Sequence, residues 1–428
     1  MAAIITAEQG IDKKRALFIG YISWFSVALF FFYQYILRVA PGVLVTDLRQ
    51  DFHLTANQFS TLGAYYLYAY SLCQIPLGII IDCVGVRKTV LASMVLCIGG
   101  AFLFAFAPTL WLLQASRMLM GLGSACAFIC SLKLVIDYLP VGRRGFLMGM
   151  TLTLGTIGAL TAGKPLALLA DTLGWRQSIY YIAFFGLVIL AIAFFILPKA
   201  RKETLIGISP DMPAQVGQSL REIISSRPVM MYAFLAISIY TPLSVMADLW
   251  GVAFLIQKYE LVRAEAAKIS MMTYLGLGLG SLVLPWFSEK YQLLNRSIRI
   301  SIVGVLAVFG LLLYGPLVSP ILLMMLLTLL GIFCGAEMLC FTGAGQHTHV
   351  RNVGMTLGVV NTLNMLGGGL LQQVIGIGLD ELWSGKLDSF GVRFYSTEEY
   401  TIALSVLMLV ILVCCVLSFR LPRDKVRG

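Results

Sequence analysis

The feature that most constrains this chain is a series of long apolar runs separated by short polar loops. They lie at about 16–44, 57–81, 88–107, 110–138, 144–170, 177–197, 229–256, 266–287, 298–317, 320–345, 353–378 and 400–420. A bilayer is spanned by a helix of about 20 apolar residues, and in lipid the helix also satisfies its own backbone polar groups. With 59% hydrophobic and 12% charged residues, the composition does not fit a soluble domain. We therefore predict an all-α membrane protein with twelve transmembrane helices.

One long polar stretch divides the twelve runs into two sets of six. It begins at Lys199 and continues to Pro228. We predict an N-terminal six-helix bundle at 1–200, a cytoplasmic linker at 201–228 and a C-terminal six-helix bundle at 229–428.

The basic residues predict the orientation. With the N-terminus inside, 20 of the 31 Lys and Arg residues fall in cytoplasmic segments, seven in outer segments and four within spans. This bias predicts that both termini are cytoplasmic. The N-terminal segment lacks a small-residue cleavage site, so we expect a cytoplasmic tail before a retained first helix. The net charge of +10 comes from short clusters rather than a basic stripe with interleaved aromatics, so we expect no nucleic-acid partner.

The loop after the second run reads GIIIDCVGVRK and contains Gly78, Asp82, Gly85, Arg87 and Lys88. Gly78 would allow close helix packing and Gly85 a tight turn, while Asp82 can meet a helix N-terminus or an arginine. The spacing predicts a gating motif that latches the cytoplasmic side. The alternative is a generic short charged loop.

These residues resemble the signature loop of the major facilitator superfamily, and RMLMGLG at 117–123 resembles its second common motif. The resemblance extends over the whole chain as a six-plus-six plan, although Cys83 stands where the family often has arginine. It implies two bundles that rock about a central substrate site near the bilayer midplane. From it we expect a bacterial inner-membrane protein that acts as a monomer on a small molecule.

Charged residues inside spans are the first candidates for that site, because burying charge in a membrane is costly. There are six: Arg38, Arg117, Lys133, Lys164, Asp248 and Glu337. Arg38, Arg117, Lys164 and Asp248 each lie six to eight residues outward of their span centres. At about 1.5 Å per residue, they should share a layer roughly 9–12 Å from the midplane. We predict that Arg38, Arg117 and Lys164 bind an anionic or zwitterionic substrate.

The pair Arg38 and Arg117 also resembles the organic-anion branch of the superfamily, in which arginines of spans one and four flank carboxylate substrates. That branch usually places acids near these arginines, where this chain has residues such as Leu37 and Ser124. The resemblance thus leaves Asp248 and Glu337 as the proton-coupling candidates. Burial penalises an ionised carboxylate more than a neutral one, which suits a proton carrier.

Each charged residue also has a structural alternative. Arg117 can hydrogen-bond to neighbouring helix backbones, and Lys164 can extend toward the outer surface. Lys133 has Asp137 one turn away, which favours a local ion pair. Asp248 and Glu337 can instead form permanent ion pairs, for example Asp248 with Lys164.

Neutral polar residues complete the predicted substrate site. Gln34 and Tyr35 extend the polar face of Arg38, and Asn361 and Asn364 lie in the eleventh run. The asparagines either line the pathway or hold helices together.

Several function classes are disfavoured. There is no G-x4-G-K-[S/T] sequence, so transport driven by ATP bound to this chain is not expected. No hydrolytic constellation stands out, and we expect no enzyme and no cofactor. The nine cysteines lie almost wholly in apolar runs and indicate neither disulfides nor a metal site.

The sequence therefore predicts a proton-coupled symporter of a small carboxylate-bearing solute, such as an organic acid, amino acid, short peptide or polycarboxylate chelator. One alternative is a proton-antiport exporter of amphipathic compounds or drugs, although the fifth run lacks the Gly-Pro pair typical of that branch. Another is a transporter-like receptor or sensor.

Overall fold

The structure is a computed structural model that describes residues 10–198, 212–349 and 352–421. The first half contains α1 Gly10–Val43, α2 Val45–Phe52, α3 Ala56–Val84, α4 Val86–Phe106, α5 Leu110–Ser124, α6 Cys126–Tyr138, α7 Val141–Thr161, α8 Lys164–Leu173 and α9 Trp175–Ile196. The helix α10 Met212–Ser225 follows. The second half contains α11 Arg227–Met246, α12 Gly251–Tyr259, α13 Arg263–Tyr291, α14 Leu294–Tyr314, α15 Pro320–Cys334, α16 Glu337–Gln346, α17 Val353–Glu381 and α18 Thr397–Ser418.

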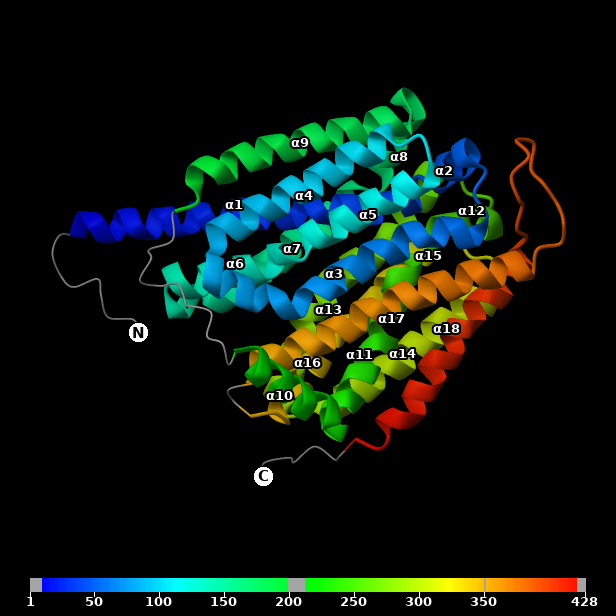
Figure 1. Ribbon diagram of the computed structural model, residues 1–428. Helices are drawn as coiled ribbons and strands as arrows, with labels where there is room; N and C mark the ends of the chain where they lie inside the picture. Colours follow the sequence, from blue (N-terminus) through cyan, green and yellow to red (C-terminus); the bar gives the residue numbers. More distant parts are fainter. Residues whose placement is uncertain (1–9, 199–211, 350–351, 422–428) are drawn as a thin grey trace.

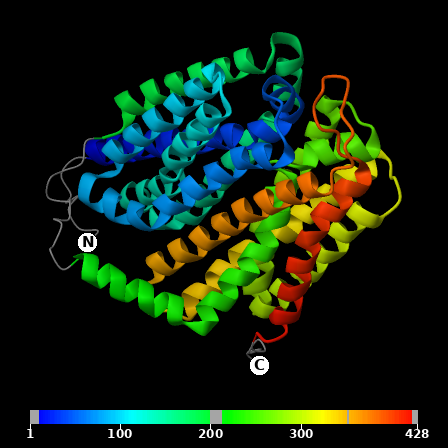
Figure 2. The same ribbon diagram turned by 45° about the vertical axis from the view of Figure 1, so that its right-hand side comes forward.

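The helices form two bundles that lie side by side (Figure 1). Helices α1–α9 form the N-half and α11–α18 form the C-half. The halves meet where α3 packs along α17 and where α7 and α8 pack along α13. Figure 2 shows the two halves closest at the end that carries α2 and α12, the α2 end, and diverging toward the opposite end, the α10 end.

The predicted all-α membrane architecture with twelve spanning helices is confirmed. Among the described residues, eleven helical segments are long and apolar enough to cross a membrane. The twelfth is α17, which is 29 residues long but carries several amides, Asn361, Asn364, Gln372 and Gln373. It packs between α3 and α11, so its polar groups lie against protein.

The structure adds a feature that the run-by-run prediction lacks, because four spans are interrupted. Span four breaks between α5 and α6, span five between α7 and α8, span seven between α11 and α12, and span ten between α15 and α16. Inside a membrane, irregular backbone is tolerated where protein or a water-filled cavity surrounds it. The breaks bring charged residues to helix ends: Asp248 lies within the span-seven break, and Lys164 and Glu337 begin α8 and α16.

Local sequence signals fix several boundaries. Thr55 caps α3 in a reciprocal box with Gln58, and Ser396 caps α18 in the same way with Glu399. Gly85 separates α3 from α4 with φ 87°, a left-handed conformation that favours glycine. The predicted linker at 201–228 is described only from residue 212, where it contains α10 and the start of α11.

Ion pairs connect the halves at the α2 end. Arg263 at the start of α13 binds two N-half carboxylates, Asp47 of α2 and Asp171 of α8. Lys164 Nζ of α8 lies 2.5 Å from Glu265 Oε1 of α13. Within the described residues, no ion pair between the halves is found at the α10 end. The charge contacts therefore favour closure at the α2 end.

The carboxylate of Asp380 adds a second kind of contact at this end. Asp380 lies near the end of α17 and accepts hydrogen bonds from the backbone N–H groups of Ala56 and Asn57, at 3.1 and 2.9 Å. These N–H groups belong to the first turn of α3, where a negative charge also interacts favourably with the helix dipole. Tyr395 and Arg393 hold the same carboxylate at 2.5 and 3.1 Å. The C-half thus caps a helix of the N-half.

Burial raises the pKa of Asp47 above its usual range, although Arg263 acts in the opposite direction. The nearby Asp171 and Asp51 add to the increase in pKa. Asp47 in the closed arrangement therefore holds a proton more readily than an exposed aspartate does.

We predict that Arg263→Gln opens the α2 end. The substitution leaves Asp47 and Asp171 facing each other without a cation, at a cost of about 1–3 kcal/mol for such partly buried groups. The measurement uses Gln257→Cys, which lines a pocket between the halves at this end, in a background without native cysteines. A membrane-impermeant maleimide should label it several times faster after Arg263→Gln.

The matched control is Arg176→Gln. Arg176 pairs with Asp51 at 2.5 Å, but both residues belong to the N-half. Its removal should leave the labelling rate unchanged. Equal acceleration by both variants would mean that general loosening, not loss of the link between the halves, exposes the cysteine.

Candidate functional site

The centre of the site is a buried ion pair that joins the halves. Arg38 lies on α1 of the N-half, and Asp248 lies in the break between α11 and α12 of the C-half. Arg38 Nε and Nη2 donate to the same carboxylate oxygen, Oδ2, at 3.0 and 2.9 Å. The two side chains are only 5% and 4% exposed. Because both donors use one oxygen, the contact is not the two-oxygen fork that a guanidinium can form with a carboxylate.

A close backbone approach brings these partners together. Gly42 lies one turn beyond Arg38 on α1, and a Cβ built there would fall 2.6 Å from the carbonyl oxygen of Asp248. Only glycine permits α1 to approach the span-seven break so closely.

Tyrosines surround the pair. Tyr274 of α13 donates to Asp248 Oδ1, and Arg38 Nη2 also donates to the Tyr240 hydroxyl. The rings of Tyr35 and Tyr240 lie 5.5 and 5.6 Å from the Arg38 guanidinium carbon, within cation–π range. The pair is therefore stabilised by neutral hydrogen bonds and aromatic faces.

One edge of the guanidinium remains open. Arg38 Nε and Nη2 have partners, whereas Nη1 makes no hydrogen bond to any residue that the structure describes. A guanidinium carries five N–H donors in a planar fork. The Nη1 N–H groups can therefore donate to another oxygen while Asp248 stays bound.

A second acid lies close to this cluster. Glu337 begins α16 directly after the span-ten break, is buried, and accepts a hydrogen bond from Asn364 Nδ2 at 2.5 Å. The Asn364 Oδ1 atom is buried and has no hydrogen-bond partner among the described residues. No ion pair is formed by Glu337 in the described part of the chain, so the expected structural alternative of a permanent pair is not observed for this acid.

Arg117 lies beside Arg38 but is directed to the backbone. Its guanidinium donates to the carbonyl oxygens of Leu37 and Leu62 at 2.7 Å each and of Arg38 at 3.1 Å, and it lies over the Tyr66 ring. Its side chain is almost fully buried. This arrangement matches the helix-packing alternative for Arg117 and gives it an indirect role, since it holds the backbone that carries Arg38.

The predicted layer of four charges is only partly assembled. Arg38, Asp248 and Arg117 are brought together, whereas Lys164 pairs with Glu265 at the α2 end. The suggested Asp248–Lys164 pair is wrong. Asp248 is paired with Arg38 of α1, and Lys164 begins a separate helix, α8, where it pairs with Glu265. The suggested local pair of Lys133 with Asp137 is also replaced, because Lys133 pairs with Asp82 of α3.

The neutral residues predicted for the site differ in placement. Tyr35 contacts Arg38 and also lies 5.5 Å from Tyr274, ring to ring. Gln34 accepts a 2.7 Å hydrogen bond from Tyr66, which ties α1 to α3. Asn361 is half-buried on α17, one turn before Asn364.

The predicted gating motif lies at the α10 end and binds within the N-half. Asp82 is held by Lys133 of α6, and Arg87 donates to the carbonyl oxygens of Phe194 and Leu197 at the end of α9. A Cβ at Gly78 would meet no atom within 4 Å, so the close packing expected there is not present. Lys88 is exposed.

Sequence reasoning missed Tyr240 and Tyr274, which contact the pair from α11 and α13. A tyrosine within an apolar run is common, and nothing in its spacing distinguishes it from a packing residue. It also missed Glu265, which lies at a predicted span boundary. One sequence feature could have indicated Glu265. Lys164 lies within a predicted span and needs an acidic partner at the same depth in the membrane.

The arrangement suits exchange of carboxylates rather than covalent chemistry. A cation with an open edge lies next to one paired acid and near one unpaired acid, and the acids belong to the half opposite Arg38. Binding of a further anion at Arg38 would weaken the attraction that joins the halves. No group of three or more metal-binding side chains occurs within the described residues.

Comparison with known proteins supports the architecture. Residues 17–371 match the family model described as Major Facilitator Superfamily. The bacterial homologue of the human lysosomal transporter Spinster, in an inward-facing and unoccupied conformation, superposes with a TM-score of 0.76 at 14% identity, covering 94% of this chain and 96% of that chain. This structural similarity concerns the fold.

Several relatives, including the following two, have names that state a substrate. A probable sulfoacetate transporter of Cupriavidus necator is 26% identical over 166 residues, or 39% of this chain and 37% of that protein. The match therefore spans less than two fifths of that relative. A probable sugar efflux transporter of Mannheimia succiniciproducens is 22% identical over 302 residues, or 69% of this chain and 72% of that protein.

We predict that Arg117→Lys destabilises the fold. A lysine cannot reach three carbonyl oxygens on two helices, and each buried carbonyl left unpaired costs about 1–3 kcal/mol. The purified variant should unfold at a markedly lower temperature than wild type, and Arg38→Lys should lower it less because Tyr240 and Asp248 remain available to a cation. A stable Arg117→Lys protein that has lost substrate binding would instead assign Arg117 to the substrate.

Proposed function

Since the chain belongs to the major facilitator superfamily, we propose that it transports a small carboxylate-bearing solute across the bacterial inner membrane by proton-coupled symport. The substrate class comprises organic acids, amino acids, short peptides and polycarboxylate chelators. The observation that carries this proposal is the buried Arg38–Asp248 pair between the halves, in which the Nη1 edge of Arg38 is free.

The substrate carboxylate binds first at the open edge of Arg38. A guanidinium grips two oxygens better than one, so the substrate then competes with Asp248 for the remaining N–H groups. A proton on Asp248 removes its negative charge and releases it from Arg38, leaving Tyr274 as its hydrogen-bond partner. Proton and anion uptake thereby favour each other, and one proton accompanies one substrate charge.

Glu337 supplies a second proton site. It is buried without a cationic partner, and its hydrogen bond to Asn364 persists whether it is ionised or neutral. While Asp248 is ionised and paired with Arg38, we propose that Glu337 holds a proton. Asn361, Gln34 and Tyr35 contribute polar and aromatic surface for the rest of the substrate, whereas Lys164 acts at the α2-end contact.

Loss of the Arg38–Asp248 attraction also loosens the halves, because these residues lie on opposite sides of the interface. In this proposal, residues 1–200 and 229–428 rock as two bodies about the pair, joined by a linker at 201–228. The α10 end is cytoplasmic with both termini inside, as the distribution of Lys and Arg predicts. The contacts at the α2 end then correspond to an inward-facing state of a monomer.

A second candidate function is proton-antiport export of amphipathic compounds. The relative named as a sugar efflux transporter, which aligns with 69% of this chain, favours it. The relative named for sulfoacetate, a compound that contains a carboxylate, favours the anion substrate. A third candidate is a transporter-like receptor or sensor. Accumulation of solute by reconstituted vesicles would exclude it.

We predict that Asp248→Asn uncouples transport from protons. In wild type, substrate binding should strengthen as the pH falls, because protonation removes the anion that competes for Arg38. In Asp248→Asn the competitor is absent, so binding should be less dependent on pH and proton-driven accumulation should be lost while counterflow exchange persists. Binding and uptake in reconstituted vesicles measure both properties, and Glu337→Gln should likewise lose accumulation.

Three comparisons separate this prediction from general damage. Asp51→Asn neutralises an acid paired within the N-half and should transport normally. Arg38→Lys should bind substrate on the order of tenfold more weakly, since lysine lacks the planar fork. An esterified substrate should bind wild type poorly. Normal accumulation by both acid variants, or equal binding of ester and acid, would refute the carboxylate mechanism.

We predict that Asp82→Asn slows turnover more than it weakens binding. Asp82 is held by Lys133 far from Arg38 along the helix axes, so its loss should alter the α10 end and not the substrate site. Single-turnover binding and steady-state uptake in vesicles separate the two effects. A matched fall in affinity and rate would show that Asp82 supports folding or binding instead.

A further inference from the structure

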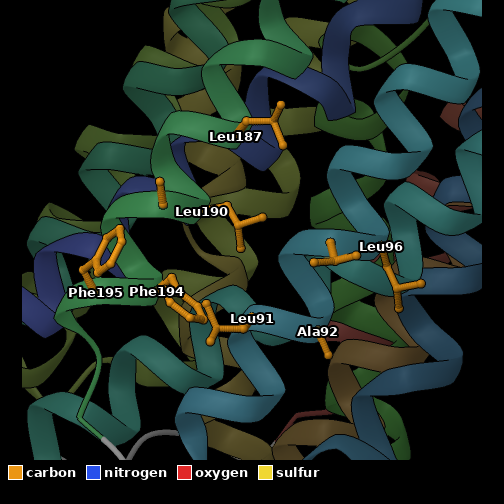
Figure 3. Close-up of a pocket in the computed structure, with 9 residues that line it drawn as sticks. Leu91, Ala92, Leu96, Leu187, Leu190, Phe194 and Phe195 are labelled. Carbon is orange, nitrogen blue, oxygen red and sulfur yellow. The ribbon is translucent and has the colours of Figure 1, made fainter.

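One surface feature that the proposed function does not explain is an apolar groove between α4 and α9. It has a volume of about 780 Å³, and all nine residues that line it are apolar. Figure 3 shows Leu91 and Leu96 of α4 on one side and Leu187 and Phe194 of α9 on the other. Helix α9 is the least buried of the candidate membrane-spanning helices in the described residues. Only 28% of its apolar 18-residue segment is buried against the rest of the protein. The groove therefore faces the hydrocarbon of the membrane.

The groove lies at the depth of a single membrane leaflet, the one at the α10 end. On α4 it extends from Leu91 to Leu96, and on α9 from Leu187 to Phe195, which is the part of each helix nearest the α10 end. From Lys88 to Leu96 is eight residues, or about 12 Å of helix rise. Half of a hydrocarbon core about 30 Å thick is close to this length, so an acyl chain of the leaflet at the α10 end fits along the groove.

A cation lies just beyond the end of the groove that is nearest the α10 end. Lys88 lies four and eight residues before Ala92 and Leu96, so all three share one face of α4. Lys88 is exposed and has no hydrogen bond or ion pair to any described residue. Arg87 lies beside it, but its guanidinium is already bound to carbonyl oxygens at the end of α9. Among the described residues at this end of α4 and α9, Lys88 is thus a cation available at headgroup level.

The geometry points to a binding site for an anionic phospholipid in the leaflet at the α10 end. One acyl chain lies in the groove between α4 and α9, and the headgroup phosphate binds Lys88. Arg87 acts as a positioning residue, because its bonds to Phe194 and Leu197 hold the end of α9 against the start of α4. A zwitterionic lipid fills the groove equally well but gains less from Lys88, because its headgroup has no net charge. The site is distinct from the Arg38 site and does not depend on the proposed substrate.

Native mass spectrometry of the full-length protein tests the proposal. The protein is released from mixed micelles that contain equal amounts of phosphatidylglycerol and phosphatidylcholine, and the lipid that stays bound is quantified. Wild type should retain phosphatidylglycerol in preference. Lys88→Gln should reduce that preference by roughly fivefold, the effect expected for one lysine at a membrane surface.

Two further variants localise the effect. Lys290→Gln removes an exposed lysine at the α10 end of α13 in the other half and should leave the preference unchanged. Ala191→Phe fills the groove and should lower retention of both lipids, with an unchanged unfolding temperature as evidence of folding. Equal retention of the two lipids by wild type, or an unchanged preference in Lys88→Gln, overturns the proposal.

Discussion

The buried contact between Arg38 and Asp248 is the interaction on which the arrangement of the two halves depends. Each charge loses its water on burial, and attraction within the pair compensates only when the remaining polar atoms are also satisfied. Tyr274 satisfies the second carboxylate oxygen, and Tyr240 takes a further N–H of Arg38. Removing either charged partner from such a pair costs about 3–5 kcal/mol, because the other is left buried and unpaired. Substitution of either partner is therefore costly, whereas in the proposed mechanism a substrate carboxylate takes the place of Asp248 and leaves no unpaired charge at Arg38.

The interrupted spans explain how charges can be placed there. A continuous helix through span seven would keep Asp248 in a regular turn, whereas the break between α11 and α12 brings its backbone against Gly42 of α1. The break between α15 and α16 similarly leaves Glu337 in the first turn of a helix, where a carboxylate is favoured by the helix dipole. The breaks thus reduce the cost of acids at membrane depth.

The sequence predicted the architecture well because membrane helices are dictated by length and polarity alone. Even the polar eleventh run was found, since its amides are too few to interrupt the apolar pattern. The charged residues of the candidate site were identified from the sequence, because a charge within a span is costly, but their pairing was not predicted. Asp248 pairs with Arg38 rather than Lys164, and Lys133 with Asp82 rather than Asp137. Pairing depends on helix rotation, on breaks such as that at Asp248, and on close approaches such as that at Gly42. Hydropathy reports none of these.

The contacts between the halves are unequal along the interface, and this inequality has a consequence for motion. At the α2 end, Arg263, Lys164 and Asp380 make several partly exposed contacts, each of modest strength because water competes for it. Deeper in the interface, within the part of the chain that the structure describes, the buried pair Arg38–Asp248 joins the halves, and in the proposed mechanism protons and anions weaken it. Opening the α2 end therefore requires many small losses at once, whereas loading the site removes one large attraction. In the proposed mechanism, a substrate that neutralises Arg38 lowers the barrier to rocking without changing the contacts at the α2 end, because the halves then depend on contacts that water can replace.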